Sequence, residues 1–216
     1  MYCTVNGIRL YYEKTGEGTP IILLHGNGES HEIFDAAVNE LSKTHTVYTT
    51  DSRCHGKSTD TEKISYNLIC SDMIEFIKTM HIEKPIFYGF SDGGIVGLLI
   101  AVKEPDLLGK LIISGANLNP NGLKTGCHLS TWLVSFTGNK LYKMMAKEPD
   151  IKNEELEKIK VPTVVLAGER DVIKEKHTRI IASSIPDSKL EIIKGETHGS
   201  YIVHSEKLYR ILQKYI

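Results

Sequence analysis

The segment Gly89-Phe90-Ser91-Asp92-Gly93 places a serine between two glycines in a G-x-S-x-G pattern. Such a pattern forms a nucleophile elbow when it lies on a sharp turn between a buried strand and a helix, because the turn lifts the serine side chain above the sheet. An apolar strand-like run precedes the segment, and a helical pattern begins at Gly93. This context favours a nucleophilic Ser91 over the alternative, a glycine-rich turn with an incidental serine.

A serine hydroxyl needs an adjacent base, and His198 and Asp171 are the candidates for base and orienting acid. His198 follows the last predicted strand, and Asp171 follows the strand before it. Both therefore reach the carboxyl edge of a parallel sheet, where such sheets place their active sites. Taken singly, the aspartate could be a helix cap or turn residue and the histidine a loop residue. In the order Ser91, Asp171, His198 they match the triad that accompanies this elbow.

Acyl transfer also needs donors for the developing oxyanion. The backbone N–H of Asp92, the residue after the nucleophile, is the first expected donor, and an N–H from the earlier strand-to-helix loop is the second. That loop is His25-Gly26-Asn27-Gly28, and we assign the donor to Asn27. A plain strand-to-helix turn is the alternative. His25 is assigned to hydrogen bonding within the loop.

These side chains need a sheet to hold them, and apolar runs alternate with helical patterns along the chain. Such alternation predicts a three-layer α/β/α sandwich with a mostly parallel sheet. The pair Asn6-Gly7 predicts an antiparallel hairpin at one edge. The predicted strands span 2–5, 8–12, 21–24, 46–50, 85–88, 110–114, 162–167 and 189–193. The predicted helices span 34–41, 69–80, 93–103, 174–184 and 208–216.

Residues 117–158 contain no strand-like run and interrupt this alternation. We interpret them as a small helical insertion, a reduced lid, within a single domain that spans 1–216. The insertion contains an aromatic patch with Trp132 and Phe136, followed by Met145.

Substrate-binding residues are harder to identify. Those expected at the site are Gly28, Glu29, Trp132, Phe136, Met145 and Tyr201. Packing of the insertion onto the sheet explains the insertion's apolar residues equally well. As a hypothesis, the carboxylates of Asp92 and Glu29 favour a cationic substrate group such as an α-amino ester. The alternative, that Asp92 only supports the elbow through hydrogen bonds, is slightly preferred.

Composition excludes several other classes of protein. Lys plus Arg is 26 and Asp plus Glu is 27, so the net charge is −1 and a nucleic-acid footprint is absent. The longest apolar stretch, 93–102, is half of the roughly 20 residues that a membrane span needs. No basic, apolar leader and no cysteine pairing pattern is present, which favours free thiols and a cytoplasmic location. Without H-E-x-x-H or C-x-x-C spacing, no metal or cofactor is expected.

Taken together, the motifs resemble those of serine hydrolases of the α/β-hydrolase fold. The matching segments are 25–28, 51–58, 89–93, 168–171 and His198, spread over nearly the whole chain. Segments 89–94 and 112–117 are similar to the valacyclovir-hydrolase-like subset of that family. The resemblance implies a nucleophile at Ser91, an acid at Asp171, a base at His198 and oxyanion donors at Asn27 and Asp92.

Two departures from the family pattern stand out. Segment 51–58 usually has the form D-x-R-G-x-G-x-S, and Cys54 replaces its first glycine. If that position requires a positive φ, the cysteine is strained. The insertion is also shorter than the usual lid, which implies a more open site.

The expected activity is hydrolysis of an ester or thioester of a small molecule through an acyl-enzyme. The same triad serves C–C bond hydrolysis and perhydrolysis, and the sequence does not separate these reactions. A non-catalytic ligand receptor on the same scaffold stays open as well, since a fold does not dictate its function. A purely structural role ranks lowest. The oligomeric state is not predicted.

Overall fold

One mixed sheet of eight strands runs through the computed structural model, which describes all of residues 1–216. Its strand order is β1-β2-β4-β3-β5-β6-β7-β8. β1 and β2 pair antiparallel, as do β2 and β4, and every later pair is parallel. The strands are β1 Tyr2–Val5, β2 Ile8–Thr15, β3 Thr19–Leu24, β4 His45–Thr50, β5 Ile86–Phe90, β6 Lys110–Ser114, β7 Thr163–Arg170 and β8 Ser188–Thr197.

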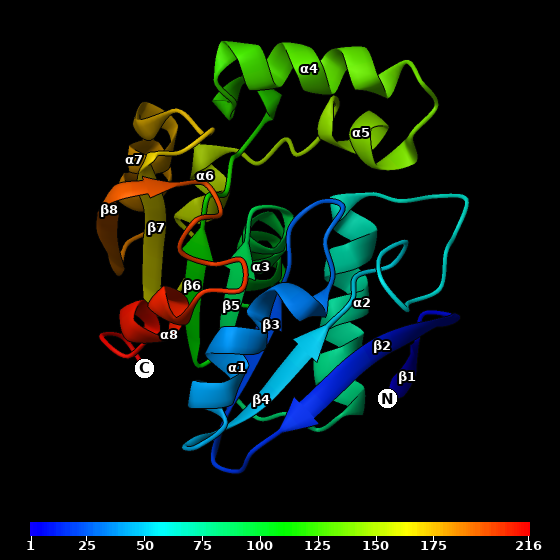
Figure 1. Cartoon of the computed structure of the whole chain (residues 1–216), viewed down its shortest axis with the longest axis vertical. Helices are drawn as coiled ribbons and strands as arrows, with labels where there is room; N and C mark the ends of the chain where they lie inside the picture. Colours follow the sequence, from blue (N-terminus) through cyan, green and yellow to red (C-terminus); the bar gives the residue numbers. More distant parts are fainter.

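Helices cover both faces of this sheet (Figure 1). α1 (Asp35–Leu41) and α8 (Glu206–Leu212) pack on one face, together with the short 3-10 helix η1 (His31–Phe34). α2 (Tyr66–Thr79), α3 (Asp92–Lys103) and α7 (Glu175–Ser184) pack on the other. Two apolar cores result, one on each side of the sheet. This arrangement confirms the predicted three-layer α/β/α sandwich.

The edge hairpin forms where the sequence predicts it. Asn6 and Gly7 both have positive φ, 46° and 77°, as a type I′ turn requires. The predicted boundaries of the second and last strands are too short, because β2 continues to Thr15 and β8 to Thr197. These extensions are polar and partly exposed, so apolar periodicity does not reveal them.

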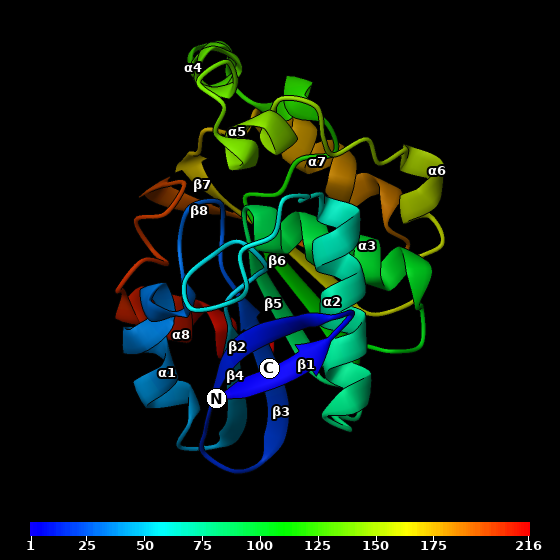
Figure 2. The same ribbon diagram turned by 90° about the vertical axis from the view of Figure 1, so that its right-hand side faces the viewer.

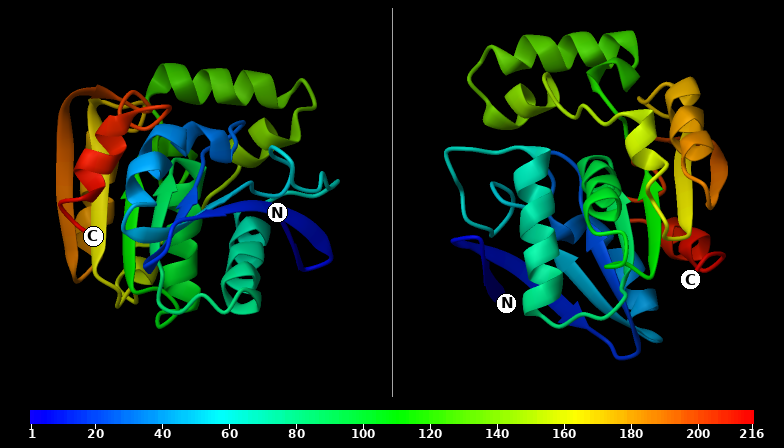
Figure 3. Two further views of the ribbon diagram at one scale, coloured as in Figure 1. Left: turned by 60° about the horizontal axis from the view of Figure 1, so that its bottom comes forward. Right: turned by 180° about the vertical axis from the view of Figure 1, so that it is seen from behind.

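Between β6 and β7 the chain leaves the sheet and forms helices only. These are η2 (Pro120–Gly122), α4 (Thr125–Ser135), α5 (Lys140–Met145) and α6 (Asn153–Leu156). Figures 1 and 2 show α4 and α5 extending above one end of the sheet, while α6 lies lower beside α7 and α3. The two views of Figure 3 show that α4 stands clear of the central layers on its outer side.

The loop after β4 contains the cysteine that departs from the family pattern. Cys54 has a φ of 64°, in the region that favours glycine, so the expected strain is present. Its Sγ lies 3.2 Å from the Thr61 hydroxyl. Next to it, Arg53 and Asp72 form a buried ion pair with N–O distances of 2.5 and 2.6 Å. This pair ties the loop to α2.

No helix of this structure has both the length and the apolar content that crossing a membrane requires.

Candidate active site

Ser91 lies at the turn between β5 and α3. β5 is buried along its whole length, and α3 begins immediately after the serine. Ser91 adopts φ 54° and ψ −113°, an unusual backbone conformation that costs on the order of 1–3 kcal/mol. A Cβ on Gly89 would lie 2.1 Å from the Gly93 carbonyl oxygen, so the turn requires its glycines. The segment therefore has the geometry of a nucleophile elbow.

Three side chains from three strand ends meet at this turn. The Ser91 Oγ lies 3.0 Å from His198 Nε2, and His198 Nδ1 lies 2.7 Å from Asp171 Oδ1. Asp171 is buried, while the His198 side chain is 22% exposed on the cavity side. Both distances are within hydrogen-bond reach, so His198 can take the serine proton and Asp171 can hold the imidazole tautomer.

Backbone groups fix the acid and leave room for the base. Asp171 Oδ1 also accepts a hydrogen bond from the Ile173 N–H at 2.9 Å. A Cβ on Gly115 would lie 2.6 Å from His198 Cε1, so only a glycine leaves space for the imidazole there. The Phe90 ring packs against the His198 ring at 4.9 Å between centroids. The imidazole is thus confined on several sides.

The loop after β3 lies beside the serine. The Asn27 N–H has no acceptor within the protein, and the Asp92 N–H, at the start of α3, has none within its helix. Both residues line the same cavity as Ser91. Two unpaired amides next to a nucleophile are what an oxyanion hole needs.

His25 has a structural role in this loop. Its Nδ1 lies 2.7 Å from the Gly26 carbonyl oxygen, and its Nε2 accepts a hydrogen bond from the Ser52 N–H at 3.1 Å. Burial lowers the pKa of His25 to about 4, with help from the neighbouring His55. The imidazole is therefore neutral near pH 7, and it ties the loop after β3 to the loop after β4.

Above the serine, a cavity of about 250 Å³ opens toward the helical insertion. Its lining combines Ser91 and His198 with apolar side chains from α4, α5 and the neighbouring loops. The lining residues are Asn27, Glu29, Phe90, Ser91, Asp92, Asn117, Leu123, Cys127, Tyr142, Met145, Val172, Ile173 and His198.

Some of the predicted substrate-binding residues reach this cavity and others do not. Glu29 and Met145 line it, whereas Gly28 does not. Trp132 and Phe136 are 49% and 70% exposed and pack edge-to-face with each other on the outer side of α4. Tyr201 is fully buried in the core beneath α8. For Trp132 and Phe136 the reason is that α4 turns its small side chains Cys127 and Thr131 inward, so its bulky face points away from the site. For Tyr201 it is that the ring packs into the apolar core on the α8 side of the sheet.

Sequence reasoning missed several lining residues. No sequence motif includes Leu123, Cys127 or Tyr142. Val172 and Ile173 directly follow the segment that contains Asp171. Phe90 and Asn117 could have been found, because they lie inside segments 89–94 and 112–117 that resemble the family.

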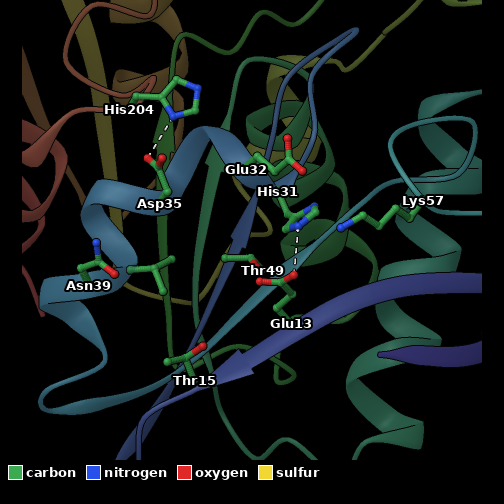
Figure 4. A pocket seen from close by; sticks show the side chains of 10 residues that line it. Glu13, Thr15, His31, Glu32, Asp35, Asn39, Thr49, Lys57 and His204 are labelled. Carbon is green, nitrogen blue, oxygen red and sulfur yellow. Dashed lines mark ion pairs between the residues drawn. The ribbon is translucent and has the colours of Figure 1, made fainter.

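A second cavity, of about 500 Å³, is lined by residues of β2, β4, η1 and α1 (Figure 4). Four of its polar groups form two pairs: His31 Nε2 lies 3.2 Å from Glu13 Oε1, and His204 Nδ1 lies 3.0 Å from Asp35 Oδ1. None of the three triad residues lines it. The larger cavity is therefore separate from the reacting groups.

Comparison with known proteins gives consistent results. A family model described as the alpha/beta hydrolase fold matches residues 19–136. The chain is 24% identical to the serine hydrolase BPHL of Homo sapiens, over 98% of this chain and 84% of that protein. It superposes on Est816, described as an N-acyl homoserine lactone degrading enzyme, with a TM-score of 0.86 at 19% identity over the whole of both chains. The enol-lactonase from Burkholderia xenovorans LB400 gives 0.83 at 20% identity, over 99% of this chain and 98% of that one.

Proposed function

The chain belongs to the alpha/beta hydrolase fold family of enzymes, and from this premise we propose that it is a serine hydrolase that cleaves an ester or thioester of a small molecule. The observation that carries the proposal is the continuous contact from Asp171 through His198 to Ser91, at 2.7 and 3.0 Å. The small-molecule partner and the cytoplasmic location expected from the sequence are part of the same proposal.

The reaction follows from the contacts. His198 Nε2 takes the proton from Ser91 as its Oγ attacks the carbonyl carbon, and the amides of Asn27 and Asp92 hold the oxyanion. The alcohol or thiol then leaves with the proton from His198, and Ser91 keeps the acyl group. Water, deprotonated by His198, repeats the attack and releases the acid. Asp171 stabilises the imidazolium in both halves.

The cavity limits the substrate. Ligand pockets commonly span about 300–1,000 Å³, and this one, at about 250 Å³, lies below that range. Apolar side chains from the insertion make up much of its wall. A short acyl group fits these dimensions better than a long one.

We expect kcat/KM for p-nitrophenyl esters to be highest for acetate or butyrate and to fall about tenfold or more for octanoate. The reason is that a cavity of about 250 Å³ is too small for the longer acyl chain. A fluorophosphonate should label one residue, and mass spectrometry should locate the adduct on Ser91. Absence of both turnover and labelling would favour the receptor alternative. Labelling without ester turnover would point to C–C bond hydrolysis or perhydrolysis.

Glu29 gives a reason to consider cationic substrates within this class. Its Oε2 accepts a hydrogen bond from the Gly26 N–H at 2.9 Å, while Oε1 has no partner within the protein. Both oxygens of Asp92, in contrast, already accept hydrogen bonds. We therefore propose Glu29, rather than Asp92, as the carboxylate that would meet a substrate ammonium group.

For this second candidate we expect an alanine ester to be hydrolysed about fivefold or more faster than the matching propionate ester. Burial raises the pKa of Glu29 above its ordinary value. The preference should therefore grow as rising pH ionises Glu29, and then fall as the substrate amine loses its proton near about pH 7.7. In Glu29→Gln the ratio should approach one. Equal rates for the alanine and propionate esters in the wild type would refute the proposal.

A further inference from the structure

A chain of hydrogen bonds connects the proposed oxyanion hole to the helical insertion. The Asn27 side-chain amide donates to Asp92 Oδ2 at 3.0 Å, and the Tyr66 hydroxyl donates to Asp92 Oδ1 at 2.8 Å. At the other end, the Tyr66 N–H donates to Glu148 Oε2 at 3.0 Å. Tyr66 is the first residue of α2, and Glu148 follows α5, so the chain joins elements far apart in sequence (Figure 1).

Asp92 is the centre of this chain, and its surroundings require partners. The residue is 6% exposed, and burial raises the pKa of its carboxyl. The donors from Asn27 and Tyr66 act in the opposite direction and favour the ionised form. The N-terminus of α3 also favours a negative charge at this position. An ionised Asp92 can accept from both donors at once, which fixes its side chain between them.

The same residue carries one of the two oxyanion donors. Tyr66 and Asn27 hold the Asp92 carboxylate, and this restrains the Asp92 backbone and its N–H. The second donor, the Asn27 N–H, lies on the loop that faces it. The Asn27–Asp92 hydrogen bond therefore sets the spacing of the two donors. Tyr66 does not line the cavity and is buried in the core on the α2 side. It is thus placed to act through Asp92 without touching substrate.

We propose that Tyr66 is a positioning residue of the oxyanion hole and that Glu148 of the insertion holds it in place. The proposal rests on the proposed hydrolase function, because only a reaction that develops an oxyanion uses the spacing of the two amides. Through Glu148, the position of the insertion affects transition-state stabilisation as well as access to the cavity.

The first test is Tyr66→Phe, which removes the hydroxyl and keeps the buried ring. For p-nitrophenyl acetate we expect kcat to fall about tenfold to a hundredfold, the effect of losing one hydrogen bond to a charged group. KM should change little, because an oxyanion exists only in the transition state. Tyr209→Phe is the matched control: it removes a hydrogen-bonded hydroxyl on α8, and its kcat should stay within about twofold of the wild type.

The pH profile separates positioning from general loosening. The neighbouring His55 and His198 lower the pKa of Asp92, and Asp92 in turn raises the pKa of Glu29. Without the Tyr66 hydroxyl, Asp92 loses a donor and its pKa rises further. In Tyr66→Phe, protonation of Asp92 should therefore lower kcat/KM at a higher pH than in the wild type. It should appear as a second step on the acid limb of the profile. A merely loosened core lowers kcat by the same factor at every pH.

Glu148 provides a test at the partly exposed end of the hydrogen-bond chain, where a substitution disturbs the core less than one at Tyr66. Glu148→Ala removes the acceptor for the Tyr66 N–H and should lower kcat about threefold to tenfold. Glu148→Gln keeps an oxygen that can accept the same bond and should return kcat to within about twofold of the wild type. Equal losses in the two variants would contradict the proposed link.

Amide hydrogen exchange tests the proposed positioning role of Tyr66 without relying on turnover. In Tyr66→Phe and Glu148→Ala, the amides of residues 25–29 should exchange about threefold or more faster than in the wild type, since the Asn27–Asp92 bond is loosened. Unchanged exchange of these amides in both variants would overturn the proposal, whatever the kcat. If the wild type shows no turnover that depends on Ser91, the proposed hydrolase function fails, and with it the role of Tyr66 in catalysis.

Discussion

Replacing Ser91 with alanine should lower kcat for p-nitrophenyl acetate by about 10⁶, the effect of losing a triad nucleophile. The Oγ is the only atom removed, and it is the atom 3.0 Å from His198 Nε2. Alanine meets the same positive φ as serine, so the turn should form at similar cost. Any remaining activity would come from the oxyanion amides acting on bound ester with water as nucleophile.

The measurement compares the steady-state kinetics of the wild type, Ser91→Ala and Ser183→Ala, with thermal unfolding of all three. Ser183 is exposed on α7 and makes only a local bond to the Ile180 carbonyl, so its variant should match the wild type. Wild-type rates in a folded Ser91→Ala would exclude Ser91 as the nucleophile.

Asp171→Asn should lower kcat by about 10³–10⁴ near neutral pH, as when the acid of a serine triad becomes an amide. Asp171 Oδ1 accepts from both His198 Nδ1 and the Ile173 N–H. An asparagine oxygen can occupy that position, but its amide group then lies where Asp171 Oδ2 is buried without a partner. In either orientation, the charge that stabilises the imidazolium is lost.

Rates of Asp171→Asn across the pH range, beside those of Asp187→Asn, check this expectation. Asp187 is exposed in the turn before β8, and its side chain makes no hydrogen bond, so its amide variant controls for the substitution itself. A loss of less than about tenfold in Asp171→Asn would mean that another carboxylate orients His198.

The sheet and the three triad positions could be predicted because each is set locally. The four apolar residues 21–24 form a strand that is buried on both faces, as such a run indicates. Ser91, Asp171 and His198 each follow a strand of that sheet, and parallel strands bring their carboxyl ends to one edge. Knowing the strand order was not needed to bring them together.

The surroundings of the triad depend on packing that a sequence pattern does not contain. Helical periodicity identifies an apolar stripe on α4 but does not say which way the stripe faces. Leu129, Trp132, Leu133 and Phe136 are all exposed, so the usual assumption of an inward stripe fails there. Tyr66 was missed for a related reason. It lies 26 positions from Asp92, and no sequence pattern near either residue predicts the hydrogen bond between them.

The triad is assembled from distant parts of the chain, and this has a consequence for its biogenesis. His198 lies 107 positions after Ser91 and 27 after Asp171. Ribosomes deliver a protein N-terminal end first, at about 5–20 residues per second. A nascent chain therefore exposes the elbow serine while its base is still unmade. On the proposed mechanism, a chain that ends before His198 has no base for Ser91, so we expect hydrolysis only after His198 has been synthesised.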